Sequence, residues 1–123
     1  MSNVPIFFNS NPQALSLYEI FENAICTEFE DVRIKVQKTQ ISFYNKHLFA
    51  CVSLPVRKIK SRPDTCLVFT IGLNRKLEHL RVAYTVEPYP GRWTHHIPLG
   101  CEDEIDDELM EWIKEAYGFA MLK

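Results

Sequence analysis

The hydrophobic pattern of this chain changes its period twice, and this change limits the fold more than any other feature of the sequence. Near the start, apolar residues recur every three or four positions, as they do along one face of a helix. From Val32 the pattern alternates with a period of two, which is typical of a strand with one solvated face. From Ile105 the helical period returns. We therefore expect an α+β domain with one helix at each end and a sheet between them.

The helices are expected over residues 12–29 and near the C-terminus. Asn11 and Pro12 favour a helix start, because the Asn side chain can accept from a free backbone N–H and Pro is tolerated in the first turn. Six acidic residues within 102–108 are expected to occupy the first turns of the second helix, where the helix dipole stabilises negative charge. Its apolar stripe consists of Ile105, Leu109, Trp112, Ile113, Ala116, Tyr117 and Ala120.

The middle of the chain is expected to form about five to six strands. They are placed at Val32 to Val36, around Ile41 and Phe43, at Leu48 to Leu54, Cys66 to Leu73, Arg81 to Glu87 and Arg92 to Leu99. The run 66–73 is apolar throughout and is interpreted as a central strand buried on both faces. Short connections imply antiparallel hairpins. Because each helix has one apolar face and the sheet needs cover, we predict a two-layer sandwich with both helices packed on a mainly antiparallel sheet.

Length and composition are those of one globular domain, residues 1–123. The 123 residues are 46% hydrophobic and 24% charged, which suffices for a core without disulfides or metal. No apolar run approaches the roughly 20 residues of a membrane span, and the N-terminus lacks a signal-peptide pattern. We expect a cytoplasmic protein with no membrane contact. Four cysteines lie at wide, irregular intervals, and the first three, in apolar segments, are expected to be buried free thiols.

The charges are unevenly distributed along the chain. Residues 33–92 hold 12 of the 14 lysines and arginines but three of the 16 acidic residues, a formal balance of +9, while the two ends together carry −11. The sheet is therefore expected to be basic and the helices acidic. Two interpretations are open: ordinary solvated faces with charge exchange between the layers, or an anion-binding sheet face or rim.

Two basic segments are candidates for contact with phosphate. In the first, Arg57, Lys58, Lys60 and Arg62 place four cations within six residues of a loop. Such a loop can also be basic for solubility alone. In the second, Lys38 and Thr39 precede a strand that would show Gln40, Ser42 and Tyr44 outward if Ile41 and Phe43 face the core. Tyr44 could stack on a base ring. The alternative for this segment is a plain hairpin turn between core residues.

The third candidate is the sequence from Arg92 to Ile97, which contains Trp93, His95 and His96. Adjacent strand residues point to opposite faces, so the two histidines cannot share a metal ion without distortion. With Trp93 in the core, His95 lies beneath the helices and His96 faces outward beside Thr94. For His95, a packed, hydrogen-bonded side chain and a catalytic role are both open. No metal spacing, nucleotide-binding loop or nucleophile motif occurs in the chain, and no cofactor is expected.

Four segments in order, QKTQISF, HLFACVSL, GRWTHHIPL and DDELMEWIKEAY, together resemble an uncharacterised prokaryotic family, the domain-of-unknown-function family numbered five-six-five-five. The resemblance covers about Pro12 to Tyr117. It implies a small α+β domain that stands alone or is attached to other domains, some of them nuclease-like, and it implies no particular reaction. The positions that match the family pattern are Lys38, Phe43, Trp93, His95, His96 and Tyr117.

Two functions remain open. The favoured hypothesis is a non-catalytic domain that holds a phosphate-rich partner, such as nucleic acid, on a basic sheet rim formed by Lys38, Lys58, Lys60, Arg62 and Arg92. The alternative is a small-molecule-binding protein or enzyme with a pocket between the sheet and the C-terminal helix, lined by Trp93, His95, Trp112 and Tyr117. A homo-oligomer that pairs an exposed edge strand is also compatible with the sequence.

Overall fold

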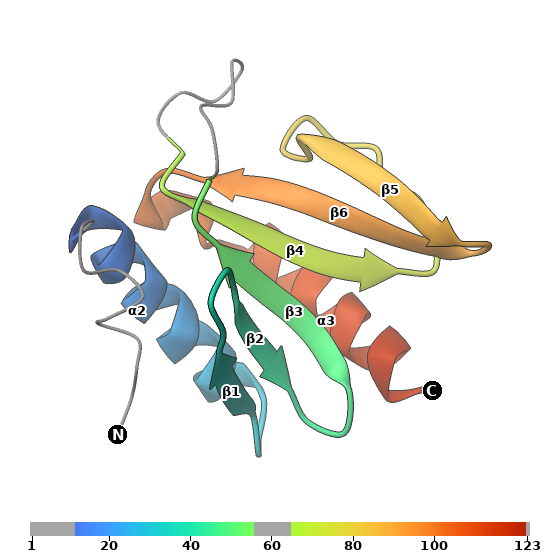
Figure 1. The fold of residues 1–123 in the computed structure, drawn as a ribbon, viewed down its shortest axis with the longest axis horizontal. Helices are drawn as coiled ribbons and strands as arrows, with labels where there is room; N and C mark the ends of the chain where they lie inside the picture. The colour runs from blue at the N-terminus through green and yellow to red at the C-terminus, as the bar shows by residue number, and fades with distance from the viewer. Residues whose placement is uncertain (1–11, 56–64, 123) are drawn as a thin grey trace.

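The structure is a computed structural model that describes residues 12–55 and 65–122. The two-layer α+β architecture is confirmed: two helices pack on one side of a six-stranded sheet (Figure 1). Within the described residues, neither helix is long and apolar enough to cross a membrane. The elements in chain order are α2 (Pro12–Glu28), β1 (Arg33–Val36), β2 (Ile41–Tyr44), β3 (Leu48–Ser53), β4 (Leu67–Leu73), β5 (Tyr84–Tyr89), β6 (Arg92–Leu99), the short 3-10 helix η1 (Glu102–Glu104) and α3 (Asp107–Met121).

All strand pairs are antiparallel, as expected, and the strand order is β1-β2-β3-β4-β6-β5. Strands that follow one another in the chain are neighbours in the sheet, except that β6 lies between β4 and β5. The β5–β6 turn runs through Pro90 and Gly91. Gly91 has a φ of 76°, the left-handed conformation that a type II turn requires after its proline. Because β6 pairs with β4 on its other side, β5 is the edge strand opposite β1.

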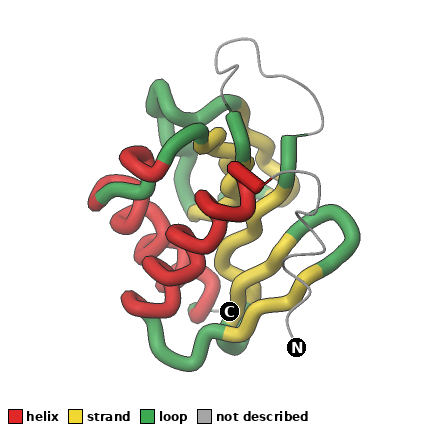
Figure 2. Tube along the Cα trace, turned by 90° about the vertical axis from the view of Figure 1, so that its left-hand side faces the viewer, coloured by secondary structure: helices red, strands yellow, loops and turns green. Residues whose placement is uncertain are grey.

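The core lies between the helices and one face of the sheet (Figure 2). Phe21 of α2 is fully buried, and its ring centroid lies 5.6 Å from that of Phe43 in β2 and 5.0 Å from that of Phe69 in β4. Just after α2, Phe29 stacks on Tyr117 of α3 with centroids 4.5 Å apart. These contacts tie both helices to each other and to the sheet. No described helix covers the opposite side of the sheet, which we call the open face.

The start of α3 differs from the expectation of one helix that begins among the acidic residues. Glu102–Glu104 form η1, and Asp106 then caps α3 by accepting a hydrogen bond from the Leu109 N–H at 3.0 Å. The Arg81 guanidinium also contacts both carboxylate oxygens of Asp106. Although partial burial raises the pKa of Asp106, these hydrogen bonds and the arginine charge lower it overall. The N-cap therefore has an ionic partner from the loop before β5.

Three other expectations are wrong in detail. β4 is not buried on both faces: its burial alternates, because α2 and α3 cover one face alone. β5 begins at Tyr84 rather than near Arg81, whose side chain is used in the contact with α3. Of the three cysteines expected to be buried, Cys66 is buried, Cys51 is half-buried and Cys26 is exposed, since Cys26 lies on the outer side of α2.

Candidate binding surface and cavity

The open face is formed by the side chains that alternate with the core residues along each strand. Ile41 and Phe43 are fully buried on the helix side, so Ser42 and Tyr44 point to the open face, as the alternation predicts. The same alternation and the strand register assign the other positions. The open face consists of Arg33, Lys35, Ser42, Tyr44, Cys51, Ser53, Val68, Thr70, Gly72, Thr94, His96, Pro98, Tyr84 and Val86.

One row of side chains crosses all six strands on this face. In the register of the sheet, Lys35 is the partner of Ser42, which is the partner of Cys51, and Cys51 is the partner of Thr70. The row continues from Thr70 to its partner His96 and ends at Tyr84, the partner of His96 on the edge strand. These six residues are defined as the polar row: Lys35, Ser42, Cys51, Thr70, His96 and Tyr84.

The first part of the polar row is joined by hydrogen bonds to the β1–β2 turn. The Ser42 hydroxyl donates to Gln37 Oε1 at 2.7 Å and accepts from Gln40 Nε2 at 3.0 Å. Gln40 Nε2 also lies 3.4 Å from the Cys51 sulfur. Burial raises the pKa of the Cys51 thiol, against a smaller opposing effect of Ser42, so Cys51 is a protonated thiol rather than a nucleophile at neutral pH.

The second part of the polar row combines a hydrogen bond with ring stacking. His96 Nδ1 lies 3.1 Å from the Thr70 hydroxyl oxygen. The Tyr84 ring stacks on the His96 ring with centroids 4.2 Å apart, and Tyr84 remains 57% exposed. Burial lowers the pKa of His96, and the nearby His95 adds to this effect, so His96 is neutral at pH 7. An uncharged aromatic pair therefore lies at the β5 end of the open face.

No open-face position carries a carboxylate, although the chain has 16 acidic residues. Near β1 and β2 the open face holds Arg33 and Lys35, and neither has a carboxylate partner in the described part of the chain. Arg33 donates to the Asn45 carbonyl, and its guanidinium carbon lies 5.5 Å from the centre of the Tyr44 ring. Lys38 and Lys46 occupy the turns at the two ends of β2 and are exposed. The open face near β1 and β2 is thus positively charged.

On the helix side, by contrast, basic residues pair with α3. Arg75 makes two hydrogen bonds of 2.8 Å with the carboxylate of Glu115. Arg81 contacts Asp106 at 3.0 Å and Glu108 at 3.4 Å. Charge exchange between layers therefore accounts for part of the basic middle of the sequence, but not for the open-face cations.

The predicted site residues are distributed over several places. Lys38 and Thr39 are exposed in the turn that precedes β2, at the end of the sheet where β3 finishes. Arg92 lies at the opposite end, where β4 finishes and β6 begins. Lys58, Lys60 and Arg62 lie outside the described residues. The described part of the predicted rim is therefore not one continuous surface.

Trp93 and His95 lie on the core side of β6, away from the open face. His95 is fully buried, and its Nε2 accepts a hydrogen bond of 2.8 Å from the Leu77 backbone N–H. The proton of the neutral ring is then on Nδ1, which has no hydrogen-bond partner in the described structure. Burial lowers the pKa of His95 and Arg75 adds to this effect, and together they exceed the opposing effects of the Ile71 and Trp93 backbone and of Glu115. His95 is thus a core residue, as the alternation predicts.

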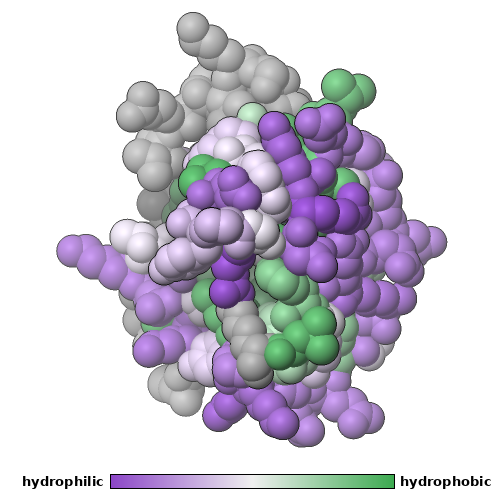
Figure 3. Space-filling model, turned by 90° about the vertical axis from the view of Figure 1, so that its right-hand side faces the viewer, coloured by the Kyte–Doolittle hydropathy of each residue, from purple (hydrophilic) through white to green (hydrophobic). Residues whose placement is uncertain are grey.

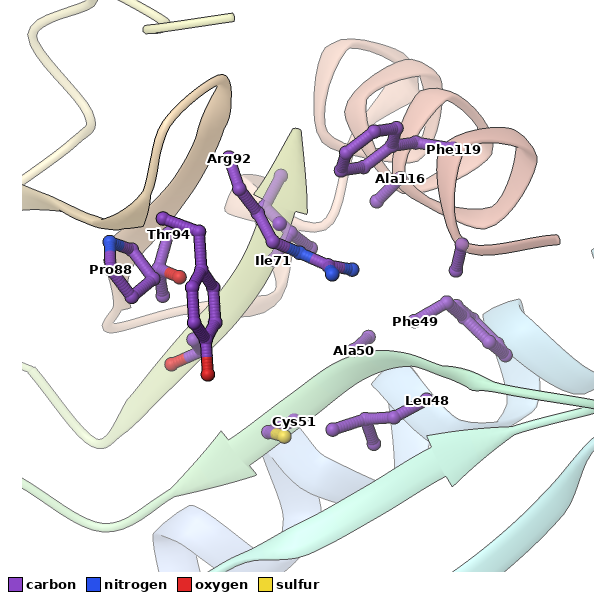
Figure 4. Close-up of a pocket in the computed structure, with 14 residues that line it drawn as sticks. Leu48, Phe49, Ala50, Cys51, Ile71, Pro88, Arg92, Thr94, Ala116 and Phe119 are labelled. Atoms are coloured by element: carbon purple, nitrogen blue, oxygen red, sulfur yellow. The ribbon is translucent and has the colours of Figure 1, made fainter. Parts of the chain in front are cut away.

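A cavity of about 290 Å³ lies where β3 and β4 separate (Figure 4). Ala116, Phe119 and Ala120 of α3 line one side of it, and Arg92 points toward its middle. The sequence predicts a pocket between the sheet and the C-terminal helix that is lined by Trp93, His95, Trp112 and Tyr117. None of these four residues lines the observed cavity. His95 and Trp112 are buried in the core, Tyr117 packs against the core, and the Trp93 ring contacts the Lys76 ammonium group instead.

Sequence reasoning missed most of the open-face and cavity residues. Thr70 and Gly72 interrupt the apolar run 66–73 at every second position, and this is the signal that one side of β4 is not core.

In the described residues there is no cluster of three or more His, Cys, Asp or Glu side chains that could hold a metal ion.

Comparison with curated proteins and with solved structures found no match. A protein-family model does match, over residues 6–120, which is nearly the whole chain. The family is described as a domain of unknown function, and its model covers all six strands, the whole of α2 and all but the last residue of α3. The resemblance noted in the four sequence segments is therefore confirmed, and the chain belongs to the family Domain of unknown function (DUF5655).

Proposed function

We propose that this protein is a non-catalytic binding domain for single-stranded nucleic acid, which lies across the open face of the sheet. The observation that carries the proposal is the absence of carboxylates from a sheet face that offers cations at one side and an exposed tyrosine at the other. Single-stranded nucleic acids bind to such faces because phosphates pair with Lys and Arg while bases stack on aromatic rings.

The positions of the charges support this assignment. Lys35 belongs to the polar row, Arg33 is on the same strand and face, and Lys38 continues the positive surface into the adjacent turn. The polar row gives a path of about 24 Å from β1 to β5, because strands are about 4.8 Å apart. A path of this length accommodates about four nucleotides, the lower end of the range for single-strand binding modules.

The net charge of −2 does not oppose this binding, because the acidic residues are on other surfaces. Those of α2 and α3 lie on the helix layer, on the other side of the sheet. A helix is about 10 Å across, more than the Debye length of about 8 Å at physiological salt, so repulsion from the helix layer is largely screened on the open face. The basic segment 57–62 is compatible with the same partner, although its position lies outside the described residues.

The test is fluorescence anisotropy with labelled oligo-U and oligo-dT of about 12 nucleotides. If about three phosphates are neutralised, affinity falls by about twentyfold between 50 and 200 mM salt. Lys35→Ala weakens binding and lowers the slope of log K against log salt by about 0.7, the value of one phosphate contact on a single strand. The matched control is Lys114→Ala, which removes a lysine of α3 that pairs with Glu28 and Glu111.

Tyr84→Ala provides a second, uncharged test. It weakens binding by removing a base-stacking surface, and it leaves the salt slope unchanged because no phosphate contact is lost. The proposal is overturned if neither oligonucleotide binds at 50 mM salt or if the affinity does not depend on salt concentration. It is also overturned if Lys114→Ala weakens binding as much as Lys35→Ala does.

A further inference from the structure

The cavity between β3 and β4 exists because the two strands part before either of them ends. Their register runs from Ser53 and Val68 to Ala50 and Ile71, where the pairing stops. β3 extends beyond this point to Leu48 and pairs there with β2, while β4 continues to Leu73 and pairs with β6. The last turns of α3 lie behind the opening, so the gap is closed on one side by helix rather than by a further strand.

The walls of the cavity are mainly apolar. Leu48 and Phe49 come from β3, and Ala116 and Phe119 come from α3. On the surface at the right-hand side of Figure 1, hydrophobic residues form a patch that is bordered by hydrophilic residues (Figure 3). Exposed apolar surface of this kind, with a polar border, is typical of ligand sites.

Arg92 is the cationic group in this lining. Its guanidinium carbon lies 5.3 Å from the centre of the Phe119 ring, which holds the guanidinium over an apolar surface. Arg75 and Arg81 each pair with carboxylates of α3, whereas Arg92 has no carboxylate partner among residues 12–55 and 65–122. A half-buried guanidinium in an apolar cavity, without such a partner, is suited to an anionic ligand.

We propose that this cavity binds a small monocarboxylate with a compact apolar body, its carboxylate paired with the Arg92 guanidinium and its apolar part against Phe119 and Leu48. A cavity of 150 Å³ accommodates benzene, so the 290 Å³ here accommodates roughly twice as many heavy atoms, about 12. Medium-chain fatty acids and bicyclic aromatic acids have this size. The proposal does not rest on nucleic-acid binding, although Cys51 and Thr70 line this cavity and also belong to the polar row.

The remaining polar groups of the cavity favour a carboxylate over a phosphate. Two carboxylate oxygens match the two parallel N–H groups that one guanidinium offers. A phosphate has more charge and more acceptor oxygens than a carboxylate, so it would need further cationic partners. The other polar side chains that line the cavity are neutral: Cys51, Thr70, Thr94 and Tyr89. Thr70 is also engaged with His96. A phosphate dianion would therefore lose hydration without sufficient compensation.

The experiment compares octanoate with 1-octanol by calorimetry and by amide chemical shifts on the full chain. Octanoate binds and shifts residues of β3, β4 and the end of α3, while 1-octanol binds at least about tenfold more weakly because it lacks the charge. Arg92→Gln reduces octanoate affinity by about tenfold or more, and Arg92→Lys retains part of it. Inorganic phosphate produces no comparable shifts.

Gly72→Val tests the cavity itself. A Cβ at Gly72 would meet one atom within 4 Å, the Trp93 carbonyl oxygen at 4.0 Å, so the strand can accept the side chain, which then occupies part of the cavity. This variant loses octanoate binding and keeps its circular dichroism spectrum. Lys35→Ala, on the other side of the open face, leaves octanoate binding unchanged. Equal binding of octanol, unchanged affinity in Arg92→Gln, or no octanoate binding at millimolar concentration overturns the proposal.

Discussion

At the scale of single residues, His95 shows how a polar side chain is accommodated in an apolar core. Its Nε2 accepts from the Leu77 N–H, and this bond requires the neutral ring. Protonation would place a charge in a fully buried position and would abolish the acceptor. His95 is therefore a structural residue that links β6 to the loop after β4.

This role predicts a pH dependence of stability. The pKa of His95 is below its ordinary value of 6.5 in the folded protein, so the unfolded chain binds more protons between the folded pKa and 6.5. The free energy of unfolding is thus highest above pH 6.5 and decreases as the pH falls toward the folded pKa. Urea denaturation at pH 7.5 and 5.5 measures the difference.

The matched variants are His95→Gln and His47→Gln. Removing the buried imidazole reduces the loss of stability between the two pH values, and the remaining loss includes the contribution of His96, whose pKa is also lowered. His47, in the β2–β3 turn, serves as the control for removal of a histidine outside the core. A pH dependence in His95→Gln equal to that of the unaltered protein would contradict the assignment.

At the scale of elements, the start of α3 depends on Asp106 in two ways. Its carboxylate caps the helix at the Leu109 N–H and pairs with Arg81 from the loop before β5. Asp106→Ala removes both interactions and is expected to destabilise the protein by about 1–2 kcal/mol. Chemical denaturation measures this change.

Asp106→Asn separates the two contributions. Asn caps a helix about as well as Asp, so this variant loses the ion pair alone, and half-exposed ion pairs contribute about 0–1 kcal/mol. A loss in Asp106→Asn as large as in Asp106→Ala would show that the ion pair, rather than the cap, stabilises α3.

The elements also show what local sequence can predict. Strand β6 begins and ends at the expected residues, because Arg92 to Leu99 alternates regularly and follows a Pro-Gly turn. For β4 the sequence predicts burial on both faces, because the run 66–73 is almost entirely apolar. Its actual exposure depends on which side the helices cover, and this is a tertiary property.

At the scale of the whole molecule, both helices share one core with the sheet. Phe21 of α2 contacts aromatic rings of β2 and β4, and Phe29 stacks on Tyr117 of α3. Neither helix can therefore unfold without loss of core contacts made by the rest of the domain. We expect one cooperative unfolding transition, as is usual for domains of this size.

This cooperativity is tested by two probes in urea. Tryptophan fluorescence reports on Trp93 in β6 and Trp112 in α3, whereas far-ultraviolet circular dichroism reports on all helices and strands. The two curves coincide, and Phe29→Ala, which is expected to cost about 3 kcal/mol, shifts both midpoints together. Separated midpoints in Phe29→Ala would indicate that α2 unfolds independently.

The sequence alone determined the order of elements, the layer architecture and the inward side of most strands, because these follow from local periodicity. It also determined the opposite directions of His95 and His96, since adjacent strand residues must alternate. Only the tertiary structure decided that β6 lies between β4 and β5, that Lys38 and Arg92 are at opposite ends of the sheet, and that β3 and β4 separate to form a cavity. These features depend on strand pairing between segments far apart in the chain, which no local pattern specifies.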